Sequence, residues 1–192
     1  MNLKLILFFA LLKFGLCSAQ LSPVTIVLKN GEKLVGIGKI KSTTFKYKTD
    51  ADAKAQEFDF SKIESIELQK DDYSKGIYKF FQVKNTETYV AVEEIITGKN
   101  INLYTITSNR YMPGNSTMPS QSVTVSRYFL KRPSEDKLTD LGEYSPIMNN
   151  LKEKVMEYFL VFKSLIEKLE AREFKVREGL EKIVIYYNES CG

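Results

Sequence analysis

Residues 24–41 read VTIVLKNGEKLVGIGKIK. The stretch opens with a β-branched run, Val24 to Leu28, which favours an extended strand. Asn30-Gly31 separates this run from a second apolar one, and Asn-Gly in that position is a strong signal for a β-hairpin. The return strand is expected over Leu34–Lys41, so the folded chain is predicted to begin with a hairpin.

The strand pattern continues as far as residue 130. Apolar runs recur with turn signals between them, such as Gly98-Lys99-Asn100 before Ile101. The further strands are expected at Phe45–Lys48, Phe58–Phe60, Ile63–Leu68, Ile77–Val83, Tyr89–Ile96, Ile101–Thr107 and Val123–Leu130. No helical pattern lies between them to carry a parallel crossover. We therefore predict an antiparallel β-meander over residues 20–142, folded as a sandwich or an open barrel.

Residues 108–122 interrupt this rhythm. They contain Pro113-Gly114 and Pro119 and are long for a hairpin connection, so we expect a mobile and variable loop. Asn115 and Asn188 each begin an Asn-x-Ser/Thr sequon, which matters only in a eukaryotic secretory pathway.

The last third of the chain has a helical period. Ser145-Pro146 is a good helix start, with Ser as cap and Pro at the first helical position. Apolar residues then recur at three- and four-residue steps from Ile147 to Leu169, which predicts one amphipathic helix of about 25 residues. A second apolar face runs from Val176 to Tyr187. The prediction is an α+β protein in which residues 145–190 form a two-helix hairpin packed on the β domain.

Residues 1–19 have the layout of a secretory signal peptide. Lys4 supplies the positive end, Leu5 to Leu12 is apolar, and small residues precede a cut between Ala19 and Gln20. A membrane anchor is disfavoured because Lys13 interrupts a run that is already too short to span. The membrane is therefore expected to be met only through the signal peptide, and the product to be exported to the periplasm or cell surface.

Cleavage also decides the cysteine count. Cys17 leaves with the signal peptide, so Cys191 is the one remaining thiol and no intramolecular disulfide can form. In an oxidising compartment a lone cysteine is either a free thiol or the link of a disulfide dimer. Both alternatives stay open.

Composition excludes several function classes. The chain has no His and no Trp, which removes His-based triads, His-liganded metals and indole sugar platforms. Its 28 basic and 24 acidic residues are too balanced for a nucleic-acid binder. We expect neither a cofactor nor a metal.

Several short stretches match only part of a motif for catalysis or metal binding. The Asp50-Ala51-Asp52 start of a calcium loop lacks the later ligands and its glycine. Gly36-Ile37-Gly38 has no following helix and is read as tight packing in a strand. Ser134-x-x-Lys137 lacks the partner motifs of acyl-enzyme chemistry. The adjacent carboxylates at 71–72 and 93–94 point to opposite faces of a strand. We expect no enzyme.

One basic surface is a candidate binding site. Four lysines alternate along the second and third expected strands, and positions of the same parity share a face. These are Lys39, Lys41, Lys46 and Lys48. Such a face would favour an anionic partner, such as envelope polysaccharide or lipid headgroups.

Several segments carry a resemblance. They are Leu28-Lys29-Asn30-Gly31, the run 58–66, Ile101 to Tyr104, Tyr128 to Arg132, and the closing stretch from Glu173-Phe174 through 181–188 to Cys191. Together they resemble an uncharacterised family of small exported Bacteroidetes proteins, especially flavobacterial ones, with an N-terminal β domain and a C-terminal helix pair. The resemblance implies an envelope protein and transfers no active site. A helix-locking cysteine that it implies near Phe162 is absent here.

These features favour a non-catalytic, exported cell-envelope protein that binds an envelope protein or glycan. One alternative is a periplasmic hydrolase or sugar-modifying enzyme that uses only carboxylates, Lys and Tyr. Another is a structural or stress-related surface protein.

Overall fold

A computed structural model describes residues 21–114, 119–144 and 150–190. The signal segment with its Ala19–Gln20 cut, Asn115, the Ser145-Pro146 helix start and Cys191 lie outside the described residues. The strands are β1 (Ser22–Leu28), β2 (Lys33–Ile40), β3 (Thr44–Lys48), β4 (Gln56–Asp59), β5 (Ile63–Gln69), β6 (Lys75–Gln82), β7 (Tyr89–Ile96), β8 (Asn102–Met112), β9 (Gln121–Lys131) and β10 (Thr139–Glu143). The helices are η2 (Phe60–Lys62), α2 (Leu151–Tyr158), α3 (Lys163–Glu170), η3 (Val176–Glu178) and α4 (Glu181–Ser190).

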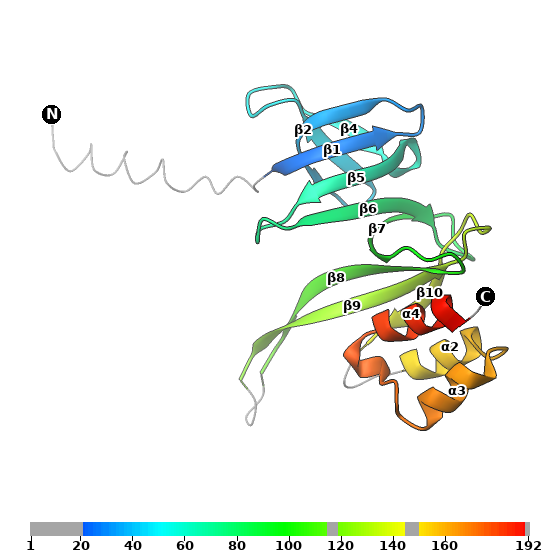
Figure 1. Ribbon diagram of the computed structural model, residues 1–192. Helices are drawn as coiled ribbons and strands as arrows, with labels where there is room; N and C mark the ends of the chain where they lie inside the picture. The colour runs from blue at the N-terminus through cyan, green and yellow to red at the C-terminus, as the bar shows by residue number, and fades with distance from the viewer. Residues whose placement is uncertain (1–20, 115–118, 145–149, 191–192) are drawn as a thin grey trace, which may run out of the picture.

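All ten strands form one continuous antiparallel sheet. Its order is β10-β9-β8-β7-β6-β5-β1-β2-β3-β4 (Figure 1). The strand β1 therefore has β2 to β4 on one side and β5 to β10 on the other, each set in chain order. The α+β class and the antiparallel sheet are thus confirmed. The first turn also follows the sequence, because Gly31 takes a positive φ of 88° and Asn30 Oδ1 accepts the Glu32 N–H at 3.0 Å.

The first half of the sheet curls around an N-terminal core. Cross-strand neighbours share a face, and Ile26 of β1 faces Leu34 of β2 and Ile66 of β5. The 3-10 turn η2 crosses back over the same face, where the ring of Phe60 lies 4.8 Å from that of Phe80 in β6. This core contains Val24, Ile26, Leu28, Phe45, Tyr47, Phe60, Ile63, Ile66 and Phe80.

The two glycines of the Gly-x-Gly in β2 make room for aromatic side chains of this core. A Cβ on Gly36 would lie 2.7 Å from the Tyr47 ring, and one on Gly38 would lie 2.4 Å from the Phe45 ring. Only glycine lets these two aromatic side chains lie flat across β2, so tight packing accounts for both positions.

The second half of the sheet curls the other way. Its central core, which consists of Val83, Val92, Tyr104, Phe129 and Leu138, lies on the opposite face of the strands. The β9–β10 connection closes it: Leu138 bridges Val83, and its N–H donates to the Gln82 carbonyl at 2.8 Å. Burial here raises the pKa of Tyr104 to about 12. One sheet therefore buries one face in its first half and both faces in its second.

The helices cover the remaining face of β8–β10. Leu103 and Leu130 are paired across the ladder and are both fully buried against the helical layer. Their neighbours Tyr104 and Phe129 are buried on the other face, so these two strands are covered on both sides. Within the described residues, the structure holds no helix with the length and apolarity needed to cross a membrane.

The first expected helix is two helices, which corrects the prediction of a single helix of about 25 residues. The chain turns at residues 159–162 between α2 and α3, and the Phe162 N–H donates to the Phe159 carbonyl at 2.8 Å. The cause is tertiary packing. The rings of Phe159 and Phe162 lie 4.9 and 5.4 Å from the ring of Tyr187 in α4, so both sides of the turn are held against that helix.

Asn188 fastens α4 to the sheet. Its amide donates to the carbonyls of Ile101 at 2.9 Å and Val184 at 3.0 Å, while its oxygen accepts the N–H groups of Asn100 and Ile101. The β7–β8 turn is thereby held by a helix 87 residues further along the chain. Since all four hydrogen-bonding positions of this amide are used, the sequon at Asn188 marks a structural residue.

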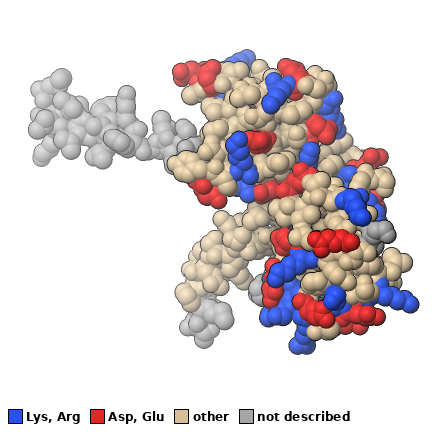
Figure 2. Space-filling view, viewed as in Figure 1, with Lys and Arg blue, Asp and Glu red and all other residues tan. Residues whose placement is uncertain are grey.

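Residues 108–112 and 121–122 are strand, which corrects the expectation of a loop over the whole of 108–122. Beyond Ile106, β8 and β9 continue as a two-stranded ribbon that projects away from the body (Figure 1). We call residues 107–112 and 121–126 the arm. One of its faces pairs Thr107 with Ser126, Asn109 with Thr124 and Tyr111 with Ser122. Figure 2 shows charged side chains of both signs over the N-terminal half of the sheet and over the helices. In this view it shows none on the outer part of the arm.

Replacing Asn188 by Ala should destabilise the fold by about 2–3 kcal/mol, because the Ile101 N–H and carbonyl lose their shared partner inside the molecule. Urea unfolding of the mature chain measures this. The matched control is Glu189→Ala, which removes an exposed side chain from the same helix. Equal stability of the two variants would contradict the anchoring role.

Shortening the arm should leave the body intact. Ser108 and Val125 are cross-strand partners, so an Asn-Gly turn can join them in place of residues 109–124. The unfolding midpoint should change little, because the main loss is the exposed Arg110–Glu143 ion pair, worth at most about 1 kcal/mol. A chain that no longer folds would show that the arm is part of the core structure.

Candidate functional site

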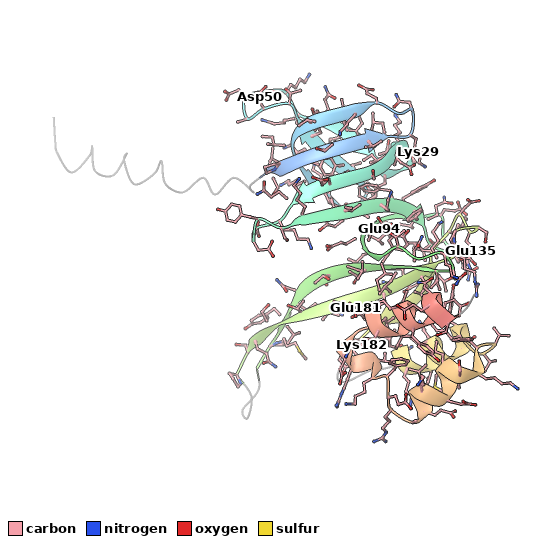
Figure 3. The ribbon with its side chains drawn as sticks, in the orientation of Figure 1. Lys29, Asp50, Glu94, Glu135, Glu181 and Lys182 are labelled. Atoms are coloured by element: carbon pink, nitrogen blue, oxygen red, sulfur yellow. The ribbon has the colours of Figure 1, made fainter. Side chains whose placement is uncertain are left out.

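A polar cleft of about 500 Å³ opens at one edge of the sheet. It lies where the two curls meet, and the β1–β2 turn, the start of β5, the β6–β7 hairpin and the end of β9 all reach it. Its lining residues are Lys29, Glu64, Phe80, Phe81, Gln82, Tyr89, Lys131, Asp136 and Lys137. Lys29, which lines the cleft, and Glu135, which precedes the lining residue Asp136, lie on the same side of the molecule in Figure 3. We call this the lysine cleft.

Two of its lysines lie over aromatic rings. Lys29 Nζ is 5.6 Å from the centre of the Tyr89 ring, and Lys131 Nζ is 5.2 Å from that of Phe81. A ring face attracts an ammonium group without neutralising it. Among the described residues neither lysine forms an ion pair, and Lys131 donates only weakly to the Arg132 carbonyl at 3.4 Å. Both charges therefore stay available to an anion in the cleft.

The remaining lining residues supply hydrogen-bonding groups of both kinds. Lys137 has a loose contact of 3.8 Å with Glu87 at the rim. Glu64 and Asp136 bring carboxylates to the same cleft, and Gln82 brings an amide that donates to Glu87 at 3.3 Å. The lining thus carries three ammonium groups and two carboxylates, with Glu87 beside Lys137 at the rim, so the cleft offers both cations and acceptors for hydroxyl groups.

One wall of the cleft is held by Glu135. Its carboxylate accepts from Lys84 Nζ at 2.9 Å and from the Arg132 N–H at 3.2 Å. Partial burial raises the pKa of Glu135, but these hydrogen bonds and the nearby positive charges outweigh it, so the pKa lies below its usual value. The β9–β10 connection, which carries Asp136 and Lys137, is thus fixed to the chain after β6.

The four lysines singled out in the sequence lie elsewhere. The strand register places Lys39 directly opposite Lys46, with Lys48 further along β3, on the outer face away from Phe45 and Tyr47. Lys41 forms an ion pair with Glu57, which stands opposite Lys46. Lys48 donates to the Ala51 carbonyl at 2.7 Å. A carboxylate thus partly neutralises this face, and its role as a ligand surface stays a prediction.

The incomplete motifs acquire local structural roles. Asp50 closes its own turn by accepting the Asp52 and Ala53 N–H groups at 3.0 and 2.9 Å. The pKa of Asp50 is lowered chiefly by the hydroxyl of Thr49. Glu93 is bound to Lys70. In the described part of the chain no group of three or more acidic, His or Cys side chains could hold a metal ion.

Sequence reasoning missed the lysine cleft as a site. Lys29 and Lys131 are 102 positions apart and carry no motif, and only the curl of the sheet brings them to one edge. The sequence does contain one signal for these two lysines, since each of them follows an apolar run at the end of a strand. That pattern also describes many ordinary surface lysines.

Comparison with protein-family models, with curated proteins and with solved structures finds no match to this chain. The arguments about its function therefore rest on its own residues.

Replacing Glu135 by Gln should loosen the cleft wall. A carboxylate with a lowered pKa adds stability above its ordinary value near 4.5, and this stability is lost as the pH falls through the lower, folded-state value. At pH 7 the variant should be less stable by about 1 kcal/mol, since the group is partly exposed. The difference should vanish in acid. Urea unfolding at several pH values measures it, and a difference independent of pH would contradict the role.

Proposed function

We propose that the protein is an exported, non-catalytic binding protein of the cell envelope whose ligand is an acidic glycan bound in the lysine cleft. One observation carries the proposal. Lys29 and Lys131 line one cleft, each positioned over an aromatic ring and neither in an ion pair with a described residue.

An acidic glycan fits the other groups of the cleft. Its carboxylates would meet the three ammonium groups, and its hydroxyls would donate to Glu64 and Asp136. Tyr89 and Phe81 would hold the ammonium groups of Lys29 and Lys131 in place for the ligand, in keeping with ligand pockets in which a few polar groups fix orientation. The signal-peptide layout of residues 1–19 supports a location where such polymers occur.

The export step has a simple test. Expression of the full chain in a bacterial host with an envelope should give a product in the periplasmic or surface fraction that begins at Gln20. Intact-mass spectrometry of that fraction reads the cut. A full-length product retained in the cytoplasm would overturn this part of the proposal.

Binding is tested by calorimetry on the mature chain with oligomers of galacturonic acid and with uncharged galactose oligomers as the matched ligand. The acidic oligomers should bind and the neutral ones should not. The double variant Lys29→Gln, Lys131→Gln should weaken binding about 100-fold, since each charged contact is worth about 1.5 kcal/mol.

The matched control variant changes two lysines outside the cleft, Lys39→Gln and Lys46→Gln. It should bind as tightly as the unmodified chain, because these residues lie on the outer face of β2 and β3. Loss of binding in the control alone would move the site to that face. Absence of binding to any acidic oligomer would favour the structural role.

A second candidate function has one observation in its favour. Glu64 and Asp136 bring two carboxylates to the same cleft, which is the minimum that carboxylate-based glycoside hydrolysis requires. The same oligomers decide between the two. Release of reducing ends that is lost in Glu64→Gln and in Asp136→Asn would make the protein a hydrolase, whereas stable binding without turnover supports the binding protein.

A further inference from the structure

A second, smaller cleft of about 300 Å³ lies in the helical layer. It is bounded by the start of α2, the end of α3 and the segment that leads into η3. Its lining residues are Lys152, Leu169, Arg172, Phe174, Lys175, Val176 and Arg177. Leu169 and Val176 are buried and Phe174 is half-buried, so the floor is apolar while four basic side chains surround it. We call this the arginine cleft.

These four positive charges are only slightly neutralised. No carboxylate belongs to the described lining of the arginine cleft. Lys175 has one ion pair, with Glu178 at 3.3 Å. Neither arginine, nor Lys152, forms an ion pair with any residue of the described ranges. Four cations from three segments thus line one cleft, and an anion bound there would be attracted by all of them.

The backbone at Arg172 adds an independent argument. The chain leaves α3 through a motif in which the Glu173 N–H donates to the Lys168 carbonyl at 2.9 Å and the Arg172 N–H to that of Leu169 at 3.3 Å. The residue after the cap must then take a positive φ, and glycine is usual there. Here that residue is Arg172, with φ of 61°. Arg172 thus occupies a left-handed backbone position that glycine would occupy with less strain, and its guanidinium lies at the cleft.

Helix electrostatics alone does not explain the arrangement. A cation near the end of a helix interacts favourably with its dipole, and Lys168 in the last turn of α3 already fills that role. Arg177 and Lys152 belong to other segments than α3 and line the same cleft. The shared feature of the four residues is the cleft that they surround.

We propose that the arginine cleft binds a phosphate monoester group, with the apolar part of the ligand lying against Phe174. A phosphate monoester carries a charge of about −1.5 to −2 at neutral pH and offers three acceptor oxygens. Guanidinium groups match this geometry with paired hydrogen bonds. The group can come from a free small molecule or from a lipid headgroup. This inference does not depend on the glycan proposal, because the two clefts lie in different parts of the fold.

The experiment uses the mature chain with three probes: inorganic phosphate, phenyl phosphate, and phosphatidylcholine vesicles with or without phosphatidate. Calorimetry measures the two soluble probes and flotation measures the vesicles. Phenyl phosphate should bind more tightly than inorganic phosphate because of Phe174. Binding only to phosphatidate vesicles assigns the site to a lipid headgroup, and binding to the soluble esters assigns it to a free one. Absence of binding to all three overturns the proposal.

The variant Arg172→Gly separates the ligand role from a folding role. Glycine relieves the backbone strain, so the thermal midpoint should stay the same or rise, while phosphate ester binding should weaken about tenfold or more. The matched control is Tyr73→Gly, which relieves a similar φ of 63° at an exposed turn outside the cleft. It should leave binding unchanged.

Arg177→Gln is the second test, since it removes a charge from a different segment without touching the strained turn. It should also weaken binding about tenfold or more. Unchanged affinity in both Arg172→Gly and Arg177→Gln would overturn the proposal, and so would equal weakening by Tyr73→Gly.

Discussion

The pairing of β6 with β7 is the constraint on which the rest of the structure depends. On one face of this ladder Phe80 belongs to the N-terminal core, and on the other Val92 belongs to the central core. The first half of the sheet buries one face and the second half buries both faces, and these two strands serve both cores. The helical layer then covers the face of β8–β10 that the second curl leaves exposed to water.

The lysine cleft lies where strand ends that belong to the two cores come together. The β1–β2 turn belongs to one curl and the β9–β10 connection to the other, and the cleft remains between them. Aromatic rings at this edge hold the ammonium groups of Lys29 and Lys131 in place, while Glu135 fixes the second wall. The chemistry proposed for the cleft therefore depends on a feature of the whole sheet.

Local patterns in the sequence account for much of the fold. The Asn30-Gly31 hairpin, the alternating strands and the helical period were readable because apolar spacing directly reflects which faces are buried. The apolar pattern does not predict the strand Thr139–Glu143, since this strand is short, has one fully buried apolar residue and contains a bulge. The sequence pattern predicts a loop at the arm, because the register of the arm comes from polar cross-strand pairs such as Asn109 with Thr124. The break in the first helix depends on Tyr187, and both clefts depend on long-range contacts that a one-dimensional pattern does not contain.

Native-state hydrogen exchange of the mature chain under increasing urea tests the shared ladder most directly. Buried amides of β1, β5, β6, β8 and β9 should open with one common free energy, equal to that of global unfolding, because the two curls share β6 and β7. The arm should exchange far faster, since none of its side chains is buried and most are exposed. The contrary result is that strands β1 to β5 open at a distinctly lower free energy while β8 and β9 are still protected. That result would show two independent domains and would contradict the account.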